Sequence, residues 1–170
     1  MNAGVIRRQG VDGRMEILLE VIGRVESPVT ETVDEDWGRV ESEIIVDERY
    51  AAGLTGIDGF SHALVVFYMH KATFKPETHL VRRPQEREDM PMLGIFAQRA
   101  KHRPNPIGVT AVEVLGVKNN RLMVRGLDAI DGTPVLDVKP YFPIYDARGG
   151  AKVPGWVGRL MEDYFQGLWR

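Results

Sequence analysis

Four short stretches of the sequence place charged, amide and histidine side chains beside tight turns, where they could bind or transform a ligand. They are DGFSH (58–62), FYMHK (67–71), GIFAQRAKHRPNPIG (94–108) and GLDAIDGTPVLDVKPY (126–141). Each stretch adjoins or contains an apolar run that is typical of a strand. Convergent polar groups at the ends of neighbouring strands are typical of binding sites. Together the four stretches therefore predict one pocket rim.

The stiffest part of these stretches is the Arg-Pro-Asn-Pro sequence at residues 103–106. Pro104 and Pro106 each fix φ and each remove a backbone hydrogen-bond donor. They also push the preceding residues, Arg103 and Asn105, towards extended backbone. Such a segment cannot enter the middle of a sheet. We therefore expect a rigid, extended wall that presents two polar side chains and several carbonyl groups.

Several common kinds of site are absent from the sequence. There is no G-x-G-x-x-G and no G-x-x-x-x-G-K-[ST] motif, so the usual dinucleotide and nucleoside-triphosphate loops are missing. The three serines include no G-x-S-x-G elbow, which argues against a serine hydrolase. His62 and His70 share one face of a predicted strand, but they would lie roughly 26 Å apart, too far to share a metal ion. We expect no metal site.

The composition is that of one ordinary globular domain. The 170 residues are 44% hydrophobic and 27% charged, with no cysteine and a net charge of −2, so disulfides and thiolate metal sites are excluded. No apolar run approaches the ~18 residues of a membrane span, and we expect a cytoplasmic protein that does not enter a membrane.

The charge is unevenly distributed along the chain. Residues 26–58 hold ten acidic and two basic side chains, whereas residues 71–104 hold eight basic and four acidic ones. The basic segment could attract an anionic partner. Alternatively, both segments are solvated loops of opposite sign.

The pattern of apolar residues predicts a mostly β fold. Six strands are predicted, at residues 15–25, 41–47, 62–70, 107–117, 121–127 and 134–141. Asn119 and Asn120 predict a hairpin turn, and Asp47 is a suitable N-cap for a short helix at 47–54. Strands with little helix between them are typical of a barrel or a sandwich.

The remaining segments complete the predicted organisation. Residues 73–93 predict a long surface loop. The residues from 94 onward predict a strand that leads into the Pro-rich wall, and residues 156–170 predict one amphipathic helix. The expected domain spans residues 15–146, preceded by a possible leader (1–14) and followed by an extension (147–170).

Three of these stretches also resemble a known family. DGFSHALVVFYMHKA, GIFAQRAKHRPNPIGVTAVEV and GLDAIDGTPVLDVKPYFP resemble the TsaA-like family, also called TrmO or YaeB, and the resemblance covers residues 22–146. It implies a single-sheeted closed β-barrel with short helices and a long surface loop, which binds S-adenosylmethionine outside the Rossmann class. It further implies N6-methylation of N6-threonylcarbamoyladenosine beside the tRNA anticodon, often by a homodimer.

The resemblance implies two sets of site residues. The cofactor-binding set is Asp36, Trp37, His70, Lys71, Arg99, Val109, Asp128, Ile130, Asp131, Gly132 and Thr133. The set around the transfer site is Arg103, Asn105, Asp137, Lys139 and Tyr141. If a base removes the N6 proton, Asp137 is the candidate; loss of that proton to water after transfer is equally open. Asp137 and Lys139 could also form a simple surface ion pair.

The implied chemistry suits these residue types. A methyl group on a sulfonium is already activated, so its transfer depends mainly on in-line positioning. Carboxylates and backbone carbonyls favour a positively charged sulfonium. Arg82 and Arg83 of the basic segment would contact tRNA phosphates.

The sequence also departs from the family pattern. Asp-Glu-Asp-Trp-Gly at 34–38 replaces a Pro-Arg-Gln stretch, so stacking on the cofactor can continue through Trp37 while that edge repels phosphate. AQRA at 97–100 keeps Arg99 but lacks two hydroxyls of the common ATRS, and a C-terminal domain found in many bacterial members has no counterpart. Two further hypotheses therefore stay open. One is a methyltransferase acting on a small molecule or other acceptor; the other is a non-catalytic sensor of S-adenosylmethionine or a nucleotide.

Overall fold

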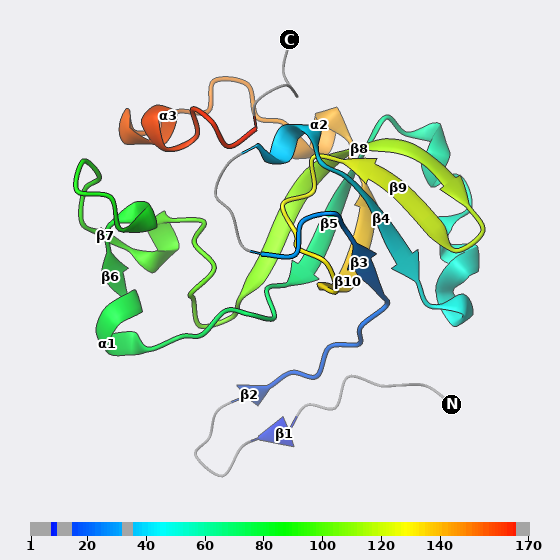
Figure 1. Cartoon of the computed structure of the whole chain (residues 1–170), viewed down its shortest axis with the longest axis horizontal. Helices are drawn as coiled ribbons and strands as arrows, with labels where there is room; N and C mark the ends of the chain where they lie inside the picture. The colour runs from blue at the N-terminus through cyan, green and yellow to red at the C-terminus, as the bar shows by residue number, and fades with distance from the viewer. Residues whose placement is uncertain (1–7, 10–14, 32–35, 166–170) are drawn as a thin grey trace.

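Six antiparallel strands form one closed barrel in the computed structural model, which describes residues 8–9, 15–31 and 36–165 (Figure 1). The strands are β3 (Gly23–Glu26), β4 (Glu41–Val46), β5 (His62–Tyr68), β8 (Ile107–Lys118), β9 (Arg121–Arg125) and β10 (Pro134–Pro140). Around the barrel they follow the order β10-β3-β4-β9-β8-β5, and β5 pairs with β10 to close the sheet. The prediction of a single-sheeted closed β-barrel is confirmed.

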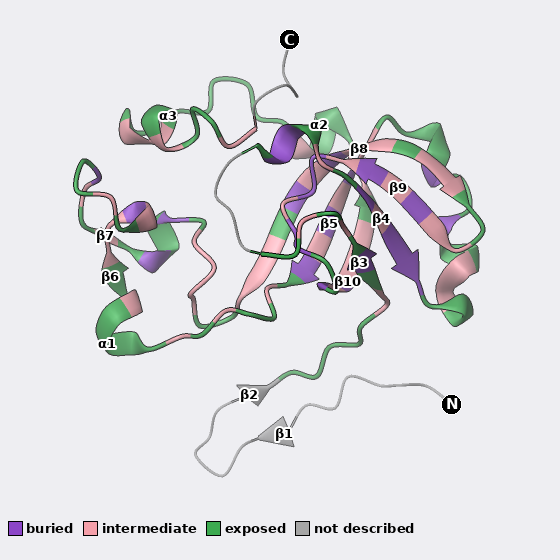
Figure 2. Cartoon of the chain, in the orientation of Figure 1, coloured by how far each residue is buried: buried purple, intermediate pink, exposed green. Residues whose placement is uncertain are grey.

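The barrel encloses a core made largely of β-branched side chains and leucines. Its most buried members, each at most 1% exposed, include Val25, Ile44, Val65, Val112 and Val124. Buried and more exposed residues alternate along the strands in Figure 2, because successive side chains of a strand point to opposite faces. The alternation seen in the sequence is thus the alternation between the barrel interior and its surface.

One end of the barrel is covered by two short 3-10 helices, η2 (Glu48–Leu54) and η3 (Ile57–Gly59). Leu54 and Ile57 complete the core there. The predicted helix at 47–54 is therefore present in 3-10 form. Asp47 occupies the predicted N-cap position, but its side chain makes no capping hydrogen bond; its Oδ2 lies 3.4 Å from Arg49 Nη2 instead.

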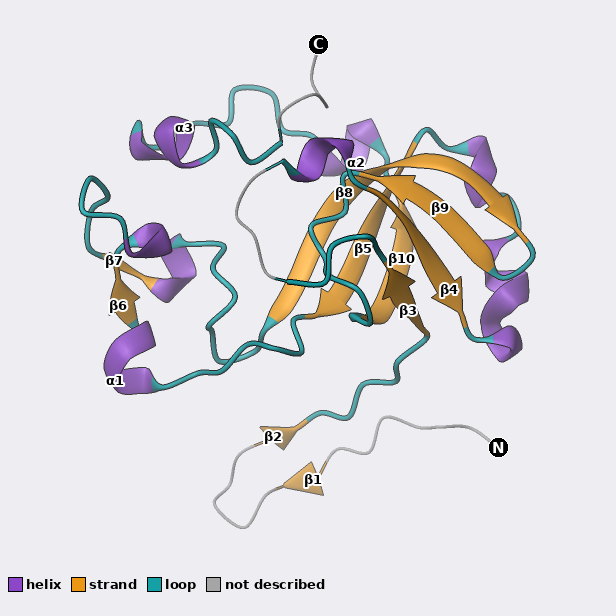
Figure 3. Cartoon of the chain, viewed as in Figure 1, coloured by secondary structure: helices purple, strands orange, loops and turns teal. Residues whose placement is uncertain are grey.

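A small lobe of residues 69–106 leaves the barrel between β5 and β8 (Figures 1 and 3). It contains α1 (Pro76–His79), β6 (Val81–Arg82) and β7 (Leu93–Gly94), with 3-10 turns η4 (Pro84–Glu86) and η5 (Ile95–Ala97). β6 pairs with β7, and Met90 and Ile95 of the lobe are each only 1% exposed. The lobe returns to its starting point, where Met69 N–H donates to the carbonyl of Pro106 at 2.8 Å.

The predicted long surface loop at 73–93 is an excursion from the barrel that contains these short elements. The strand predicted from residue 94 onward is wrong, because β7 ends at Gly94 and η5 follows it. Each element of the lobe is only two to four residues long, too short to produce a hydrophobic period that sequence patterns can detect.

The predicted strand at 15–25 is also wrong. β1 (Arg8–Gln9) pairs with β2 (Met15–Glu16), and β3 starts only at Gly23. Between β2 and β3 the apolar residues Ile17, Leu18 and Leu19 are 58–60% exposed instead of facing the core. The predicted leader, residues 1–14, lies outside the described residues apart from β1.

Two short helices follow the barrel, α2 (Pro143–Asp146) and α3 (Trp156–Leu160). The predicted helix at 156–170 is thus only five residues long, and residues 166–170 lie outside the described part of the chain. Within the described ranges, no helix has the length and apolar character needed to cross a membrane.

Candidate ligand-binding site

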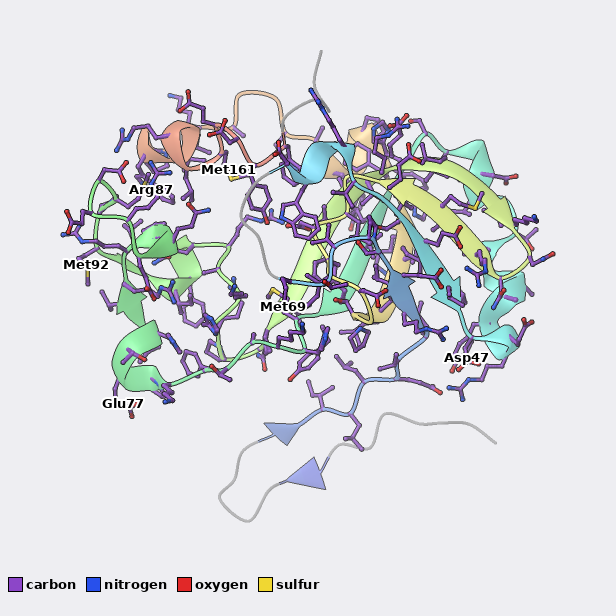
Figure 4. All side chains as sticks on the ribbon, viewed as in Figure 1. Asp47, Met69, Glu77, Arg87, Met92 and Met161 are labelled. Carbon is purple, nitrogen blue, oxygen red and sulfur yellow. The ribbon has the colours of Figure 1, made fainter. Side chains whose placement is uncertain are left out.

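A cavity of about 1170 Å³ lies between one end of the barrel and the small lobe. It is bordered by the end of β5, the start of β8, the loop after β9, the Pro-rich segment and residues 160–165. Met69 and Met161, labelled in Figure 4, border it on the β5 side and on the α3 side. Ligand pockets usually have volumes of about 300–1,000 Å³. This cavity can therefore hold a nucleoside-sized ligand and part of a second molecule.

The cavity brings together ten of the sixteen predicted site residues. They are Trp37, His70, Lys71, Arg99, Arg103, Asn105, Val109, Asp128, Ile130 and Thr133. The four stretches of sequence do not contribute equally, because DGFSH lies at the opposite end of β5. Asp36, Asp131, Gly132, Asp137, Lys139 and Tyr141 do not line the cavity.

The Asp128 carboxylate is held in place by two hydroxyl groups. Thr110, which is 6% exposed on β8, donates to Oδ1, and the Tyr164 hydroxyl donates to Oδ2 at 2.7 Å. An ionised carboxylate can accept about four hydrogen bonds. Two acceptor positions therefore remain for donors of a ligand, such as sugar hydroxyls or an ammonium group.

Trp37 forms an aromatic part of the wall. It is 2% exposed, and its amide donates to the carbonyl of Tyr164 at 3.0 Å. The neighbouring Asp36 has φ of 60° and its amide donates to the carbonyl of Asp163 at 3.0 Å. Asp36 thus helps to fix the position of Trp37 without lining the cavity itself.

The Pro-rich wall is bent and not straight. The backbone bends throughout residues 101–105, and Ile107 N–H donates to the carbonyl of Asn105 at 2.8 Å. Arg103 Nη1 donates to the carbonyl of Gln98 at 3.2 Å, whereas Asn105 is exposed. The expectation of an extended rod is wrong, although the segment does form a cavity wall.

Two cations at the cavity join loops to neighbouring backbone. Arg99 donates to the carbonyl of Val109, and Lys71 Nζ donates to the carbonyl of Thr30 at 3.0 Å. Both side chains belong to exposed residues, so their remaining N–H groups can reach an anionic ligand.

The Asp-Gly turn after β9 has a structural role in this geometry. Asp131 Oδ1 accepts from the amide of Ser27 at 3.1 Å, and Gly132, with φ of 76°, donates to the carbonyl of Val25 at 2.9 Å. The turn thereby holds the loop containing Asp128 against β3.

The predicted transfer residues on β10 do not line the cavity. Asp137 pairs with Val66, the residue before the cavity-lining Phe67, and Lys139 pairs with Leu64 in the middle of β5. Lys139 Nζ lies 2.5 Å from Asp137 Oδ2, and this hydrogen bond raises the pKa of Lys139. The two residues form a surface ion pair, which was the alternative interpretation of their spacing. The Asp137 side chain is 44% exposed and the Lys139 side chain is 62% exposed.

Several cavity residues were not predicted from the sequence. They are chiefly Phe96, Gln98, Leu160, Met161, Tyr164 and Phe165. Gln98 is 6% exposed and its Nε2 donates to the carbonyls of Arg82 and Leu93, both at 2.9 Å. The aromatic and apolar residues at 160–165 were visible as an amphipathic pattern, but only the fold brings them to Asp128.

Acidification should loosen the small lobe through His79. Its Nδ1 accepts a hydrogen bond from the amide of Lys75 at 2.8 Å, and its ring stacks on His102 with a centroid separation of 4.9 Å. Burial, followed by the nearby positive charges of His102, Arg82 and Lys75, lowers the pKa of His79 below the usual 6.5, against an opposing effect of Glu86. The unfolded lobe therefore binds a proton at higher pH than the folded lobe, and its stability should fall as the pH drops below 6.5.

Amide hydrogen exchange of residues 75–82 between pH 7.5 and pH 5 measures this effect, after correction for intrinsic exchange rates. We expect protection to fall on acidification in the natural protein and to depend much less on pH in His79→Gln. An identical pH dependence in the two proteins would assign the effect to another group.

No group of three or more histidine, aspartate or glutamate residues within the described ranges is arranged to hold a metal ion. The fold and the cavity define a class of protein: a small antiparallel barrel with a polar and aromatic cavity between one end of the barrel and a small lobe. The family model described as tRNA-methyltransferase O N-terminal domain matches residues 28–147. The chain belongs to this family, as the motifs in the sequence predicted.

Individual relatives agree with this assignment. The chain is 39% identical over 118 residues to the probable S-adenosyl-L-methionine-binding protein PYRAB06630 of Pyrococcus abyssi, covering 69% of this chain and 61% of the relative. It is 42% identical over 134 residues to an S-adenosyl-L-methionine-binding protein of Archaeoglobus fulgidus, covering 76% and 93%. It is 39% identical over 94 residues to the mouse tRNA (adenine(37)-N6)-methyltransferase, covering 55% of this chain and 21% of the mouse protein.

A solved structure supports the fold. The crystal structure of TrmO from P. aeruginosa superposes with a TM-score of 0.69 at 29% identity, covering 84% of this chain and 62% of that one. The chain therefore spans less than two thirds of some relatives and nearly the whole of others.

Proposed function

We propose that the protein is an S-adenosylmethionine-dependent methyltransferase that methylates N6 of N6-threonylcarbamoyladenosine next to the tRNA anticodon. The observation that carries the proposal is the cavity around Asp128; Asp128 itself lies within the region matched by the family model. The names of the archaeal relatives support the methyl donor, and the name of the mouse relative supports an adenine acceptor in tRNA.

The residues of the cavity fit the donor. S-adenosylmethionine, when bound, supplies a methyl group on a positively charged sulfur, and its transfer leaves S-adenosylhomocysteine and one proton to be lost from the acceptor nitrogen. Asp128 offers its two remaining acceptor positions to donor groups of the ligand, and Trp37 offers an aromatic wall to a base.

The geometry gives little support to a protein base for the N6 proton. Asp137, the sequence-based candidate, is ion-paired to Lys139 outside the cavity. We therefore propose that the N6 proton passes to water after the methyl transfer. Catalysis then depends on how the cavity positions S-adenosylmethionine and the adenosine relative to each other.

The tRNA would approach the side of the cavity formed by the small lobe. Arg82 and Arg83 are poor candidates for phosphate contacts, because the Arg82 side chain is only 14% exposed and Arg83 donates to the carbonyl of Met90. Lys75 and Arg99 are exposed, and Lys101 lines the cavity. These cations are the better candidates for the salt-dependent part of tRNA binding.

The acidic stretch at 26–58 does not favour a different acceptor. On the barrel surface Glu43 and Glu26 pair with Arg121, and Glu41 pairs with Arg125. Part of the negative charge of residues 26–58 is thus compensated locally by β9, outside the Asp-Glu-Asp-Trp-Gly edge at 34–38.

The test combines calorimetric titration with S-adenosylmethionine and a methyl-transfer assay on two tRNA samples, one with and one without the threonylcarbamoyl group. We expect saturable binding, and transfer only to the modified tRNA. Binding without transfer to either tRNA would favour a small-molecule acceptor or a sensor, and absence of both binding and transfer would overturn the proposal. Light scattering on the same sample tests the homodimer that completes the proposal, against a chain mass of 19.1 kDa.

A further inference from the structure

Residues 156–165, here called the C-terminal segment, connect the small lobe to the barrel across the cavity (Figure 1). On the lobe side, Arg159 Nε lies 3.9 Å from Asp89 Oδ2, and Arg87 Nη1 donates to the carbonyl of Arg159 at 3.5 Å. Figure 4 shows Arg87 close to α3 at the top of the lobe. The segment is thus attached to the lobe by contacts among exposed, charged residues.

On the barrel side the same segment is attached by its main chain. The carbonyls of Asp163 and Tyr164 accept hydrogen bonds from the amides of Asp36 and Trp37, each at 3.0 Å. Leu160, Met161, Tyr164 and Phe165 all line the cavity. The family model ends at residue 147, so this wall lies outside the region that the family match covers.

Within this wall, Tyr164 makes the polar contact that matters for the ligand. Its hydroxyl donates to Asp128 Oδ2 at 2.7 Å, while Thr110 donates to Oδ1. The two donors restrain both oxygens of the carboxylate and so fix the plane of the group. Because each oxygen keeps one acceptor position, the Tyr164 contact is compatible with a bound ligand and does not have to be displaced by it.

We propose that Tyr164 is a positioning residue that orients the Asp128 carboxylate for binding the methyl donor. This role rests on the proposed function, because it assumes that the donor binds at Asp128. A preorganised acceptor does not have to lose rotational freedom when the ligand binds. Loss of the Tyr164 hydroxyl should therefore weaken donor binding without changing the transfer step.

Titration of the full chain with S-adenosylmethionine tests the role of Tyr164. Tyr164→Phe keeps the ring but removes the donor, and we expect the Kd to rise about tenfold, the expected cost of immobilising one side chain on binding. In the transfer assay the KM for the donor should rise while kcat stays within about twofold. Tyr145→Phe, at a 73% exposed tyrosine outside the cavity, should bind like the natural protein.

Arg159→Ala separates this role from a general role of the wall. It loosens the attachment of the C-terminal segment to the lobe and leaves the Tyr164 contact with Asp128 unaltered, so its Kd should rise less than threefold. An equal loss of affinity for S-adenosylmethionine in Arg159→Ala and Tyr164→Phe would overturn the positioning role. Unchanged binding in Tyr164→Phe would also overturn it. Tighter binding in that variant would overturn it too, because it would mean that the Tyr164 hydroxyl competes with S-adenosylmethionine for Asp128. Absence of binding in the natural protein would instead refute the proposed function.

Discussion

Replacing Asp128 with alanine should raise the Kd for S-adenosylmethionine at least about a hundredfold. The substitution removes the carboxylate that presents two acceptor positions to the ligand, and hydrogen bonds to charged groups contribute about 1.5–3 kcal/mol each. It also leaves the Thr110 hydroxyl, in a residue only 6% exposed, and the Tyr164 hydroxyl without their common partner. We expect the free energy of unfolding to fall by about 1–3 kcal/mol as a result.

The matched control is Asp131→Ala, three residues further along the same loop. Asp131 is exposed, does not line the cavity and accepts a hydrogen bond from the amide of Ser27. Calorimetric titration and thermal unfolding of both variants should show a large loss of affinity in Asp128→Ala alone. A comparable loss in Asp131→Ala would place the ligand at the Asp-Gly turn and not at Asp128.

Replacing Gly108 with alanine should damage the core and the cavity together. A Cβ at this position would lie 2.3 Å from Phe67 Cζ, 2.4 Å from Cε2 and 2.9 Å from Cε1, well inside van der Waals contact. Phe67 is 3% exposed, belongs to the core and lines the cavity, so its ring has little space into which it can move. Overpacking of this kind costs about 1–3 kcal/mol, or several degrees in Tm for a chain of this length.

Gly59→Ala is a suitable control, because nothing lies within 4 Å of a Cβ added there. Thermal unfolding should show a clear loss in Gly108→Ala and little change in the control. Phe67→Leu in the Gly108→Ala background should cost less than the two separate losses combined, because the smaller side chain makes room for the new methyl group. Strict additivity would mean that the ring is not the obstacle.

The barrel could be predicted because each of its central strands carries its own pattern. β5 and β8 are runs of seven and twelve residues that are rich in apolar and β-branched side chains, and runs of this length and composition indicate strands. The strand predicted at 15–25 failed because apolar composition alone does not show whether a segment has a partner, and Ile17 and Leu18 have none in the core.

The site could be predicted only where it depends on local sequence. Trp37, Arg99 and Asp128 lie within motifs, and the fold brings all three to one cavity. Tyr164 could not be predicted, because its partner Asp128 lies 36 residues away in the sequence. Local sequence patterns do not show which residues so far apart come into contact. The role of Asp137 stays a prediction: it does not line the cavity, and because β10 changes register between Val135 and Asp137, the D-x-K spacing alone does not show which way its side chain faces.

The hydrogen bond between Met69 and Pro106 has a consequence for how this protein can change. It joins the two ends of the small lobe at neighbouring strands of the barrel, so closure of the lobe depends on where its ends meet and only weakly on the length of chain between them. Doubling the length of a flexible loop costs only about 0.6 kcal/mol in closure entropy. We therefore expect the barrel to tolerate insertions or deletions in the lobe that keep Lys71 and Arg99, whose side chains bond to backbone outside the lobe. Such changes would alter the lobe side of the cavity while the Asp128 end stays the same.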